Sequence, residues 1–294
     1  MTRNPMMKTA VAAAVLLAAS GLALSSAGPG AAPAQAGKTA VLEYKMPAGR
    51  VLTYQTKSEM GTAMEVMGQS MDSTTTQSST FRFASKGPKG KDLLLGVTVD
   101  DMTMSVTGAQ GDMSPDLSPL KGKSFDLVLS PLGSEIDVTG AEALEYSIAS
   151  ETRNLGNEFK QFFPDMPGKP VKIGDTWPSN VSIEERMSAL TVRIDLQYVN
   201  TLEGFEAVDG MECARIGARM TGTISGSGNQ MGQDVTFTGT TKGQDVYHFA
   251  VKEGVFVKAV SESTAEIAVD VPAAGMSIPM TQSTKGEVKL AAKN

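Results

Sequence analysis

The stretch Thr191-Val192-Arg193-Ile194-Asp195-Leu196-Gln197-Tyr198 decides the fold class of this chain. Its apolar residues alternate with polar ones, which is the period of a strand that buries one face. Residues 214–220 repeat the alternation, and Asp209-Gly210 between the two stretches is typical of a two-residue hairpin turn. The two stretches therefore predict an antiparallel hairpin with one apolar face.

The same alternation continues outward from this hairpin over most of the chain. It recurs in residues 93–99 and 267–271, and two further apolar runs, 125–129 and 136–138, flank the turn signal Pro131-Leu132-Gly133. Strands expected roughly every 8–14 residues, with polar turns between them, are typical of an antiparallel meander, sandwich or barrel. We predict a mostly β protein built from an antiparallel curved sheet, or sheets, or a half-barrel.

The first 36 residues have the pattern of a secretory signal peptide. Arg3 and Lys8 precede the apolar run Thr9–Leu24, and the small-residue site Ala34-Gln35-Ala36 follows. We expect cleavage after Ala36 and an exported mature protein, periplasmic or secreted. The apolar run is shorter than the ~20 residues of a spanning helix. No later stretch is long and apolar enough, so no membrane span is expected after cleavage.

Charge and cysteine content argue against a nucleic-acid-binding protein and against a protein stabilised by internal disulfides. The formal net charge of −6 becomes −8 once Arg3 and Lys8 are removed. An acidic protein is poorly suited to a nucleic-acid polyanion, so no such partner is expected. Cys213 is the one cysteine and cannot form an internal disulfide, so the stability of the mature chain must come from its core.

Residues 139–163 break the strand pattern. Their apolar residues follow helical spacing: Leu144, Ile148, Leu155, Phe159 and Phe162. Thr139 and Glu142 fit a capping box, and Pro164 marks the end. We predict one central helix of about 20 residues. The organisation is then a signal peptide (1–36), an N-terminal β module (37–138), a linking helix (139–163) and a C-terminal β module (164–294).

The two β modules resemble each other. Met67-Gly68-Gln69 and Met231-Gly232-Gln233 each precede a Thr-rich strand and then an aromatic-x-aromatic-Ala sequence, at Phe81–Ala84 and Tyr247–Ala250. We predict an internal duplication in which Phe81 and Phe83 correspond to Tyr247 and Phe249. The alternative is that Thr-rich alternating strands resemble each other through composition alone.

Few residues are suited to catalysis. His248 is the single histidine, and the repeat aligns it with Arg82 on the polar face of a strand. One histidine and one cysteine do not make a zinc site of nitrogen and sulfur ligands. We therefore predict no catalytic residue, no metal and no cofactor. A spatial pair of carboxylates, as in glycoside hydrolysis, stays open.

Methionine is the unusual component. Fifteen of the 18 methionines follow the signal peptide. The candidate surface for an apolar ligand, or for ordinary core packing, consists of Met64, Met67, Met102, Met104, Met276, Ile278 and Met280. Thioethers suit adaptable apolar surfaces, and they also bind Cu(I). Core packing, an apolar ligand or partner surface, and copper are the three interpretations.

Two segments carry a family resemblance. Residues 163–177 contain Pro170-Val171-Lys172-Ile173-Gly174-Asp175-Thr176-Trp177, and residues 125–133 contain Phe125 and Pro131-Leu132-Gly133. They resemble exported, β-rich bacterial proteins of unknown function that carry a P-x-x-x-G-[DE]-[TS]-W segment after a central helix. More distantly, the chain resembles the half-barrels that carry lipoproteins. The resemblance implies a sheet wrapped on a helix and no catalytic residues.

The function expected from the sequence is binding. The leading hypothesis is a non-catalytic exported or envelope β-protein that binds a lipid, an apolar small molecule or an envelope protein. The alternative is a structural or assembly protein of the envelope without a small ligand. An enzyme of undetected type is the third hypothesis. A continuous apolar cavity favours the first, a filled interior the second, and convergent polar groups with shifted pKa values the third.

Overall fold

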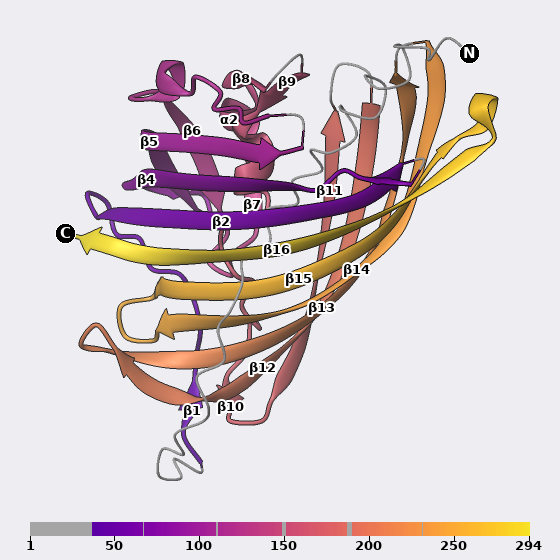
Figure 1. Cartoon of the computed structure of the whole chain (residues 1–294). Helices are drawn as coiled ribbons and strands as arrows, with labels where there is room; N and C mark the ends of the chain where they lie inside the picture. The colour runs from indigo at the N-terminus through magenta and orange to yellow at the C-terminus, as the bar shows by residue number, and fades with distance from the viewer. Residues whose placement is uncertain (1–36, 67, 110, 149–150, 187–189, 231) are drawn as a thin grey trace, which may run out of the picture.

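One large antiparallel sheet dominates the structure, a computed structural model that describes residues 37–66, 68–109, 111–148, 151–186, 190–230 and 232–294 (Figure 1). Its strand order is β11-β12-β13-β14-β15-β16-β2-β4-β5-β6-β7. The strands are β2 (Val51–Val66), β4 (Ser73–Lys89), β5 (Asp92–Gly108), β6 (Ser124–Leu129), β7 (Glu135–Asp137), β11 (Thr176–Arg186), β12 (Leu190–Val208), β13 (Met211–Gln230), β14 (Gln233–Ala250), β15 (Val255–Val271) and β16 (Met276–Lys293). The prediction of a mostly β, antiparallel curved sheet is confirmed.

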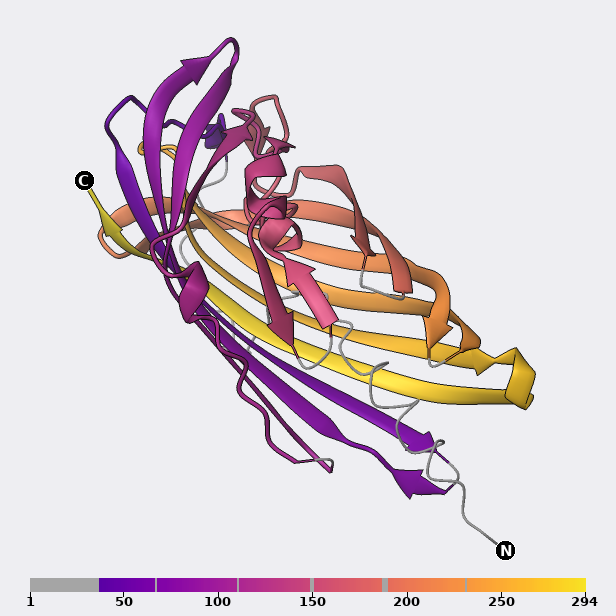
Figure 2. The same ribbon diagram turned by 90° about the horizontal axis from the view of Figure 1, so that it is seen from above.

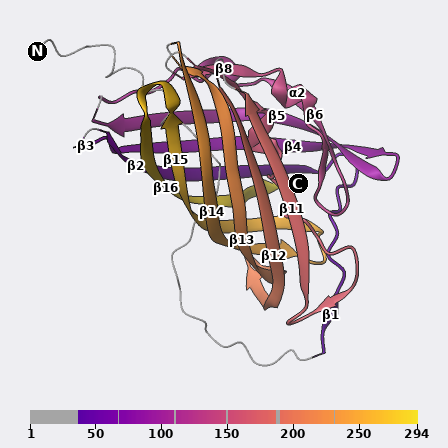
Figure 3. The ribbon, with the colours of Figure 1, turned by 90° about the vertical axis from the view of Figure 1, so that its right-hand side faces the viewer.

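The sheet is continuous across the two β modules. The last strand, β16, pairs with the first long strand, β2, from Met280 opposite Met64 to Lys293 opposite Leu52. Residues 37–138 and 164–294 therefore share one sheet. The path ends at β7 on one side and β11 on the other, so the sheet is curved without being closed (Figure 3).

Short elements complete the described chain. The small strands are β1 (Thr39–Ala40), which pairs with β10 (Val171–Lys172), and β3 (Gln69–Ser70), which pairs with β2. β8 (Glu145–Ile148) pairs with β9 (Glu151–Asn154). The helical turns are η2 (Ser118–Leu120), α2 (Thr139–Glu142), η3 (Leu155–Phe159) and η4 (Pro272–Ala274). No helix within the described residues is long and apolar enough to span a membrane.

The hairpin between β12 and β13 forms as predicted. Val208 lies opposite Met211, and the two turn residues have positive φ angles, 49° at Asp209 and 76° at Gly210. Positive φ at both central positions is the type I′ geometry that matches the twist of the flanking strands.

Two glycines of the sheet have no room for a side chain. A Cβ on Gly239 of β14 would lie 2.5 Å from the carbonyl oxygen of Glu266, and one on Gly222 of β13 would lie 2.6 Å from that of Asp195. Both distances are too short for any other residue unless the backbone shifts. Glycine at these positions therefore permits a close backbone contact between neighbouring strands that a Cβ would prevent.

The predicted central helix over residues 139–163 is wrong. The segment contains the single turn α2, the hairpin β8–β9 and the 3₁₀ turn η3. The capping box is also absent, because the Thr139 hydroxyl donates to Asp137 at 2.7 Å and Val138 occupies the N-cap position. Asn154 instead begins a new turn, with its side chain accepting the backbone N–H of Gly156 at 2.8 Å. Side-chain bonds of this kind compete with a continuing helix.

The apolar residues of this segment are nevertheless in the core. Ile148, Leu155 and Phe159 are fully buried, and Leu144 packs against them. The segment lies inside the curve of the sheet (Figure 2). The segment also contacts β11, the strand at one edge of the sheet, because Arg153 forms a largely buried ion pair with Glu185 of β11 at 3.2 Å. Helical spacing identified the buried residues but not the local structure that buries them.

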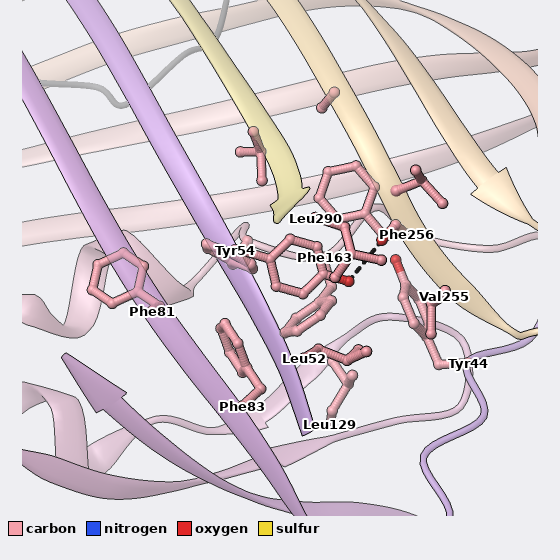
Figure 4. Packing of buried hydrophobic residues seen from close by; sticks show 14 of the residues in the cluster. Tyr44, Leu52, Tyr54, Phe81, Phe83, Leu129, Phe163, Val255, Phe256 and Leu290 are labelled. Atoms are coloured by element: carbon pink, nitrogen blue, oxygen red, sulfur yellow. Dashed lines mark hydrogen bonds between the residues drawn. The ribbon is translucent and has the colours of Figure 1, made fainter. Parts of the chain in front are cut away.

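The first of two apolar clusters, the aromatic cluster, lies under this segment. Tyr54, Phe81, Phe83, Phe163 and Phe256 meet there from three strands and the segment (Figure 4). The Tyr54 hydroxyl donates to the carbonyl oxygen of Phe256 at 2.7 Å, so its polar atom is satisfied inside the cluster. Most of the ring pairs are edge-to-face, the arrangement that aromatic quadrupoles favour.

The second cluster, the methionine cluster, lies at the opposite ends of the strands. Its buried members are Met64, Ile183, Leu190, Val192, Ile194, Leu196, Tyr198, Ala218, Met220, Ile224, Val235, Phe237, Ala265, Ile267, Val269, Ile278 and Met280. A band of buried polar residues, the polar belt, separates the two clusters. It consists of Asp245, Ser261, Gln282, Thr284, Thr62, Thr75 and Ser79.

The positions expected to correspond in a duplication lie in one cluster. Phe81 and Phe83 of β4 are buried in the aromatic cluster, as is Phe249 of β14, and Tyr247 packs against it. The Met-Gly-Gln segments contain Met67 and Met231, which lie outside the described residues. The duplication stays a prediction.

Candidate functional site

The candidate site is a cavity of about 300 Å³ on the concave face of the sheet. Residues 160–165, which follow η3, form one side of it, and strands β11 to β16 form the other. It lies where the polar belt ends at Asp245, between the aromatic and methionine clusters. The lining residues that matter below are Glu135, Lys160, Gln161, Phe162, Phe163, Asp165, Val181, Tyr198, Met220, Asp245, Tyr247, Phe256, Ala259 and Ser261.

Asp245 is the acidic centre of the cavity. It lies on β14 two residues before Tyr247, so strand alternation places both side chains on the concave face. The Tyr247 hydroxyl donates to Asp245 Oδ2 at 2.6 Å. Asp245 is 9% exposed, and burial raises its pKa to about 6, against the lowering effect of the Tyr247 and Ser261 hydroxyls.

Two further hydroxyls face this carboxyl. Ser261, on the neighbouring strand β15 directly opposite Asp245, is 5% exposed. Its Oγ has no hydrogen bond of ordinary geometry to a described residue, although it lies close enough to lower the pKa of Asp245. The Tyr198 hydroxyl accepts a hydrogen bond from Gln161 Nε2, which ties residues 160–165 to β12.

Two further acidic residues, Glu135 and Asp165, lie where residues 162–165 meet β7. Glu135 accepts the backbone N–H of Phe163 at 2.8 Å, and burial raises its pKa to about 8. The Ser134 hydroxyl donates to Asp165 at 3.2 Å, and burial also raises the pKa of Asp165. Glu135 is therefore largely protonated at neutral pH, whereas Asp245 is largely ionised.

Trp177 fixes the backbone of this acidic region. It is buried in the aromatic cluster, and its indole N–H donates to the carbonyl oxygen of Asp165 at 3.0 Å. Asn200 in turn donates to the carbonyl oxygen of Trp177 at 3.3 Å. The start of β11 is thus held against the cavity wall.

The cavity can bind by charge, hydrogen bonding and aromatic contact. Phe162, Phe163 and Phe256 belong to the aromatic cluster, whereas Tyr198 and Met220 belong to the methionine cluster. Within the described part of the chain, no group of three or more His, Cys, Asp or Glu side chains is arranged to hold a metal ion. The lining thus combines an ionised carboxyl with apolar walls.

The predicted methionine surface is divided. Met64 lies directly opposite Met280 across the β2–β16 pair, and Ile278 and Met276 join them in or against the methionine cluster. Met102 and Met104 lie in the aromatic cluster and line a separate groove of about 580 Å³ between β5 and residues 114–118. Met67 lies outside the described residues. None of the six described side chains lines the cavity around Asp245.

His248 lies away from the cavity. It faces Arg215 across the β13–β14 pair, and its Nε2 is 2.6 Å from Glu206 Oε1. Its neighbours Tyr247 and Phe249 both take part in core packing, so alternation turns His248 to the outer face of the sheet.

The acidic residues of the cavity were not predicted from the sequence. One signal was available for Asp245, which shares the parity of Val235 and Phe237 on β14 and so interrupts an apolar face with an acid. Glu135 and Asp165 gave no comparable signal, because they lie in a short strand and a loop.

Comparisons with known proteins find little. No family model matches the chain. No curated protein matches it. A solved structure from Bacteroides fragilis, of a protein described as exported and with a YmcC-like fold, covers 86% of this chain and 99% of its own at 6% identity and a TM-score of 0.27. A DUF1329 family protein from Desulfovibrio piger covers 81% of this chain and 86% of its own, at 13% identity and a TM-score of 0.17. Similarity at this level assigns neither family nor function, and the resemblance to proteins with the P-x-x-x-G-[DE]-[TS]-W segment stays a prediction.

Proposed function

We propose that the mature chain is a non-catalytic exported protein that binds a small ligand in the cavity around Asp245. One observation carries the proposal: a cavity with both apolar walls and convergent buried polar groups lies on the concave face of an open, curved sheet. Ligand sites generally have this composition, and about 300 Å³ is at the lower end of their volumes.

The packing of the two clusters limits what the ligand is. Both clusters are filled with this chain's own side chains, such as the fully buried Phe83 and the 2% exposed Met280. A long, wholly apolar ligand would have to separate them. The cavity favours a compact ligand, or the terminal part of a lipid, with polar as well as apolar groups.

An acid–base enzyme is the second candidate. The pKa values of two cavity carboxyls are shifted upward, to about 6 at Asp245 and about 8 at Glu135. Groups with such values can give and take protons near neutral pH. Each carboxyl, however, already accepts a hydrogen bond from this chain, from Tyr247 and from the backbone of Phe163. Those bonds fit positioning and binding at least as well as proton transfer.

Native mass spectrometry of protein purified from its own envelope tests the ligand. We expect a bound small molecule on the wild type and none on Val181→Trp, which fills the cavity from β11. Val199→Trp is the matched control, since Val199 lies on the neighbouring strand and is 55% exposed. Loss of the adduct in both variants, or its absence from the wild type, contradicts the proposal.

N-terminal sequencing of exported material tests the compartment. We expect the mature chain to begin near Gly37, because a small-residue cleavage site ends at Ala36. Recovery of the chain with Met1 intact from a membrane fraction would make it an anchored protein.

A further inference from the structure

The charges that face the cavity are unbalanced. Three carboxyl groups lie along its wall, but Glu135 is largely protonated at neutral pH. The carboxyls of Asp245 and Asp165 therefore lie against one cation of the lining, Lys160. Lys160 Nζ lies 3.4 Å from Glu142 Oε1, so part of its charge is already compensated. A buried carboxylate without a counter-charge is destabilising, and an opposite charge beside it removes much of that cost.

Hydrogen-bonding capacity is also left over at the acidic centre. Asp245 Oδ2 accepts a hydrogen bond from the Tyr247 hydroxyl. Ser261 Oγ, beside it, makes no hydrogen bond of ordinary geometry to a described residue. A carboxylate has room for several donors, and a serine hydroxyl both donates and accepts. The unfilled capacity is therefore mainly for a donor group that carries positive charge.

Aromatic rings complete this environment. Tyr198, Tyr247 and Phe256 belong to the sheet wall of the cavity, as Asp245 does, and Phe162 belongs to the wall formed by residues 160–165. The faces of aromatic rings attract ammonium groups, most strongly where water is excluded. Met220 extends the wall toward the methionine cluster and offers an adaptable apolar contact.

We propose that the cavity binds the ammonium group of an organic amine at Asp245 and Ser261, with the apolar body of the amine against Tyr198 and Met220. The inference rests on the proposed ligand-binding function and specifies the chemistry of the ligand. A free amine and the amino headgroup of a lipid share this chemistry. An anionic ligand is disfavoured by the ionised Asp245.

Isothermal titration calorimetry at pH 7.5 with four six-carbon probes tests this chemistry. The probes are hexylamine, hexyltrimethylammonium, 1-hexanol and hexanoate, which share the chain and differ in the head. We expect hexylamine to bind at least about tenfold more tightly than hexanol, and hexanoate not to bind, because a charge-assisted hydrogen bond is stronger than a neutral one. Hexyltrimethylammonium carries the charge without an N–H donor, so we expect it to bind more weakly than hexylamine. A monomeric lysophosphatidylethanolamine, compared with the corresponding phosphatidylglycerol, shows whether a lipid headgroup is also accepted.

Asp245→Asn assigns the preference to the carboxyl. The asparagine oxygen can still accept the Tyr247 hydroxyl, so the fold should persist. We expect this variant to bind hexylamine at least about tenfold more weakly while hexanol binding changes less than twofold. Glu266→Gln is the matched control, because it removes an exposed carboxyl from β15 that has no part in the cavity.

The pH dependence of wild-type binding provides a second measurement that requires no variant. The titratable groups closest to Asp245 are Tyr198 and Tyr247, and those that line the rest of the cavity are Asp165, Glu135 and Lys160. Hexylamine stays protonated throughout, so its affinity should fall by about tenfold from pH 7.5 to pH 5 as Asp245 takes up a proton.

The outcomes separate the inference from the proposed function. If hexanol binds as tightly as hexylamine, or if Asp245→Asn leaves hexylamine binding unchanged, the amine is refuted and the cavity remains a site for another ligand. If none of the probes binds but native mass spectrometry finds an adduct on the wild type, the amine alone is refuted. If that adduct is absent as well, the proposed ligand-binding function fails with it.

Discussion

Replacing Phe159 by alanine tests whether residues 139–163 stabilise the curved sheet. Phe159 is 0% exposed, and its ring centroid lies 4.9 Å from those of both Phe81 and Phe125, which belong to β4 and β6. Losing a buried phenylalanine costs about 3–5 kcal/mol through transfer and cavity terms. Edge-to-face ring pairs add about 0.5–1.5 kcal/mol each. We expect the free energy of unfolding to fall by about 4–5 kcal/mol, the upper part of the first range.

Urea unfolding followed by the fluorescence of Trp177 and by circular dichroism measures this change. Trp177 reports on the same cluster, and coincidence of the two signals checks that unfolding is two-state. Thr152→Ala is the control, because Thr152 is exposed on the neighbouring strand β9 and should change stability by less than about 0.5 kcal/mol. Glu158, one residue away, is unsuitable as a surface control, since burial raises its pKa. Similar small shifts in both variants would show that the segment is not part of the core.

Three further predictions follow from the strands themselves. Gly239→Ala should lower the free energy of unfolding by about 1–3 kcal/mol, because its Cβ would meet the carbonyl oxygen of Glu266. Gly204→Ala, with open space at its Cβ, is the control, and equal shifts in melting temperature would contradict the reasoning. Asp245→Asn should gain stability over the wild type as pH rises from about 4 to about 7. Burial raises the folded-state pKa of this carboxyl above its unfolded value of about 3.9. The stability that the protonated carboxyl gives the wild type is therefore fully present below pH 4 and is lost as pH rises through about 6. A difference between the two proteins that is constant from pH 4 to pH 7 in urea titrations would refute this. Cys213 should react with a maleimide only in denaturant, because it is fully buried and its pKa is raised to about 11. Labelling of the folded protein within minutes, read by mass spectrometry, would count against the buried position.

Local sequence patterns predicted the strands because strand formation depends on them. The alternation in residues 191–198 produced a buried face on β12, and Asp209-Gly210 made the predicted turn because few residues adopt positive φ readily. In residues 139–163 the apolar positions predicted burial correctly and the helix wrongly. Apolar spacing indicates which side chains are buried. The backbone conformation of the segment depends instead on local hydrogen bonds, such as the one between the Gly156 N–H and the Asn154 side chain.

The candidate site shows the limit of the sequence more clearly. Asp245, Asp165 and Glu135 are far apart in the chain and meet only because residues 160–165 fold back into the curve of the sheet. Their pKa shifts come from that burial and not from neighbours in sequence. The predicted methionines were a compositional signal, and the structure divides them between two filled clusters.

The sequence by itself determined the long alternating strands of this protein, their one apolar face, and the turns where glycine is needed, but not the local structure of residues 139–163. The tertiary structure alone decided that β16 pairs with β2, which joins the strands into one open sheet. It also decided that a cavity with an ionised aspartate remains between two packed clusters. The physical reason is range. Alternation and turn geometry act over a few residues, but desolvation and the pairing of charges depend on groups that only the folded chain brings together.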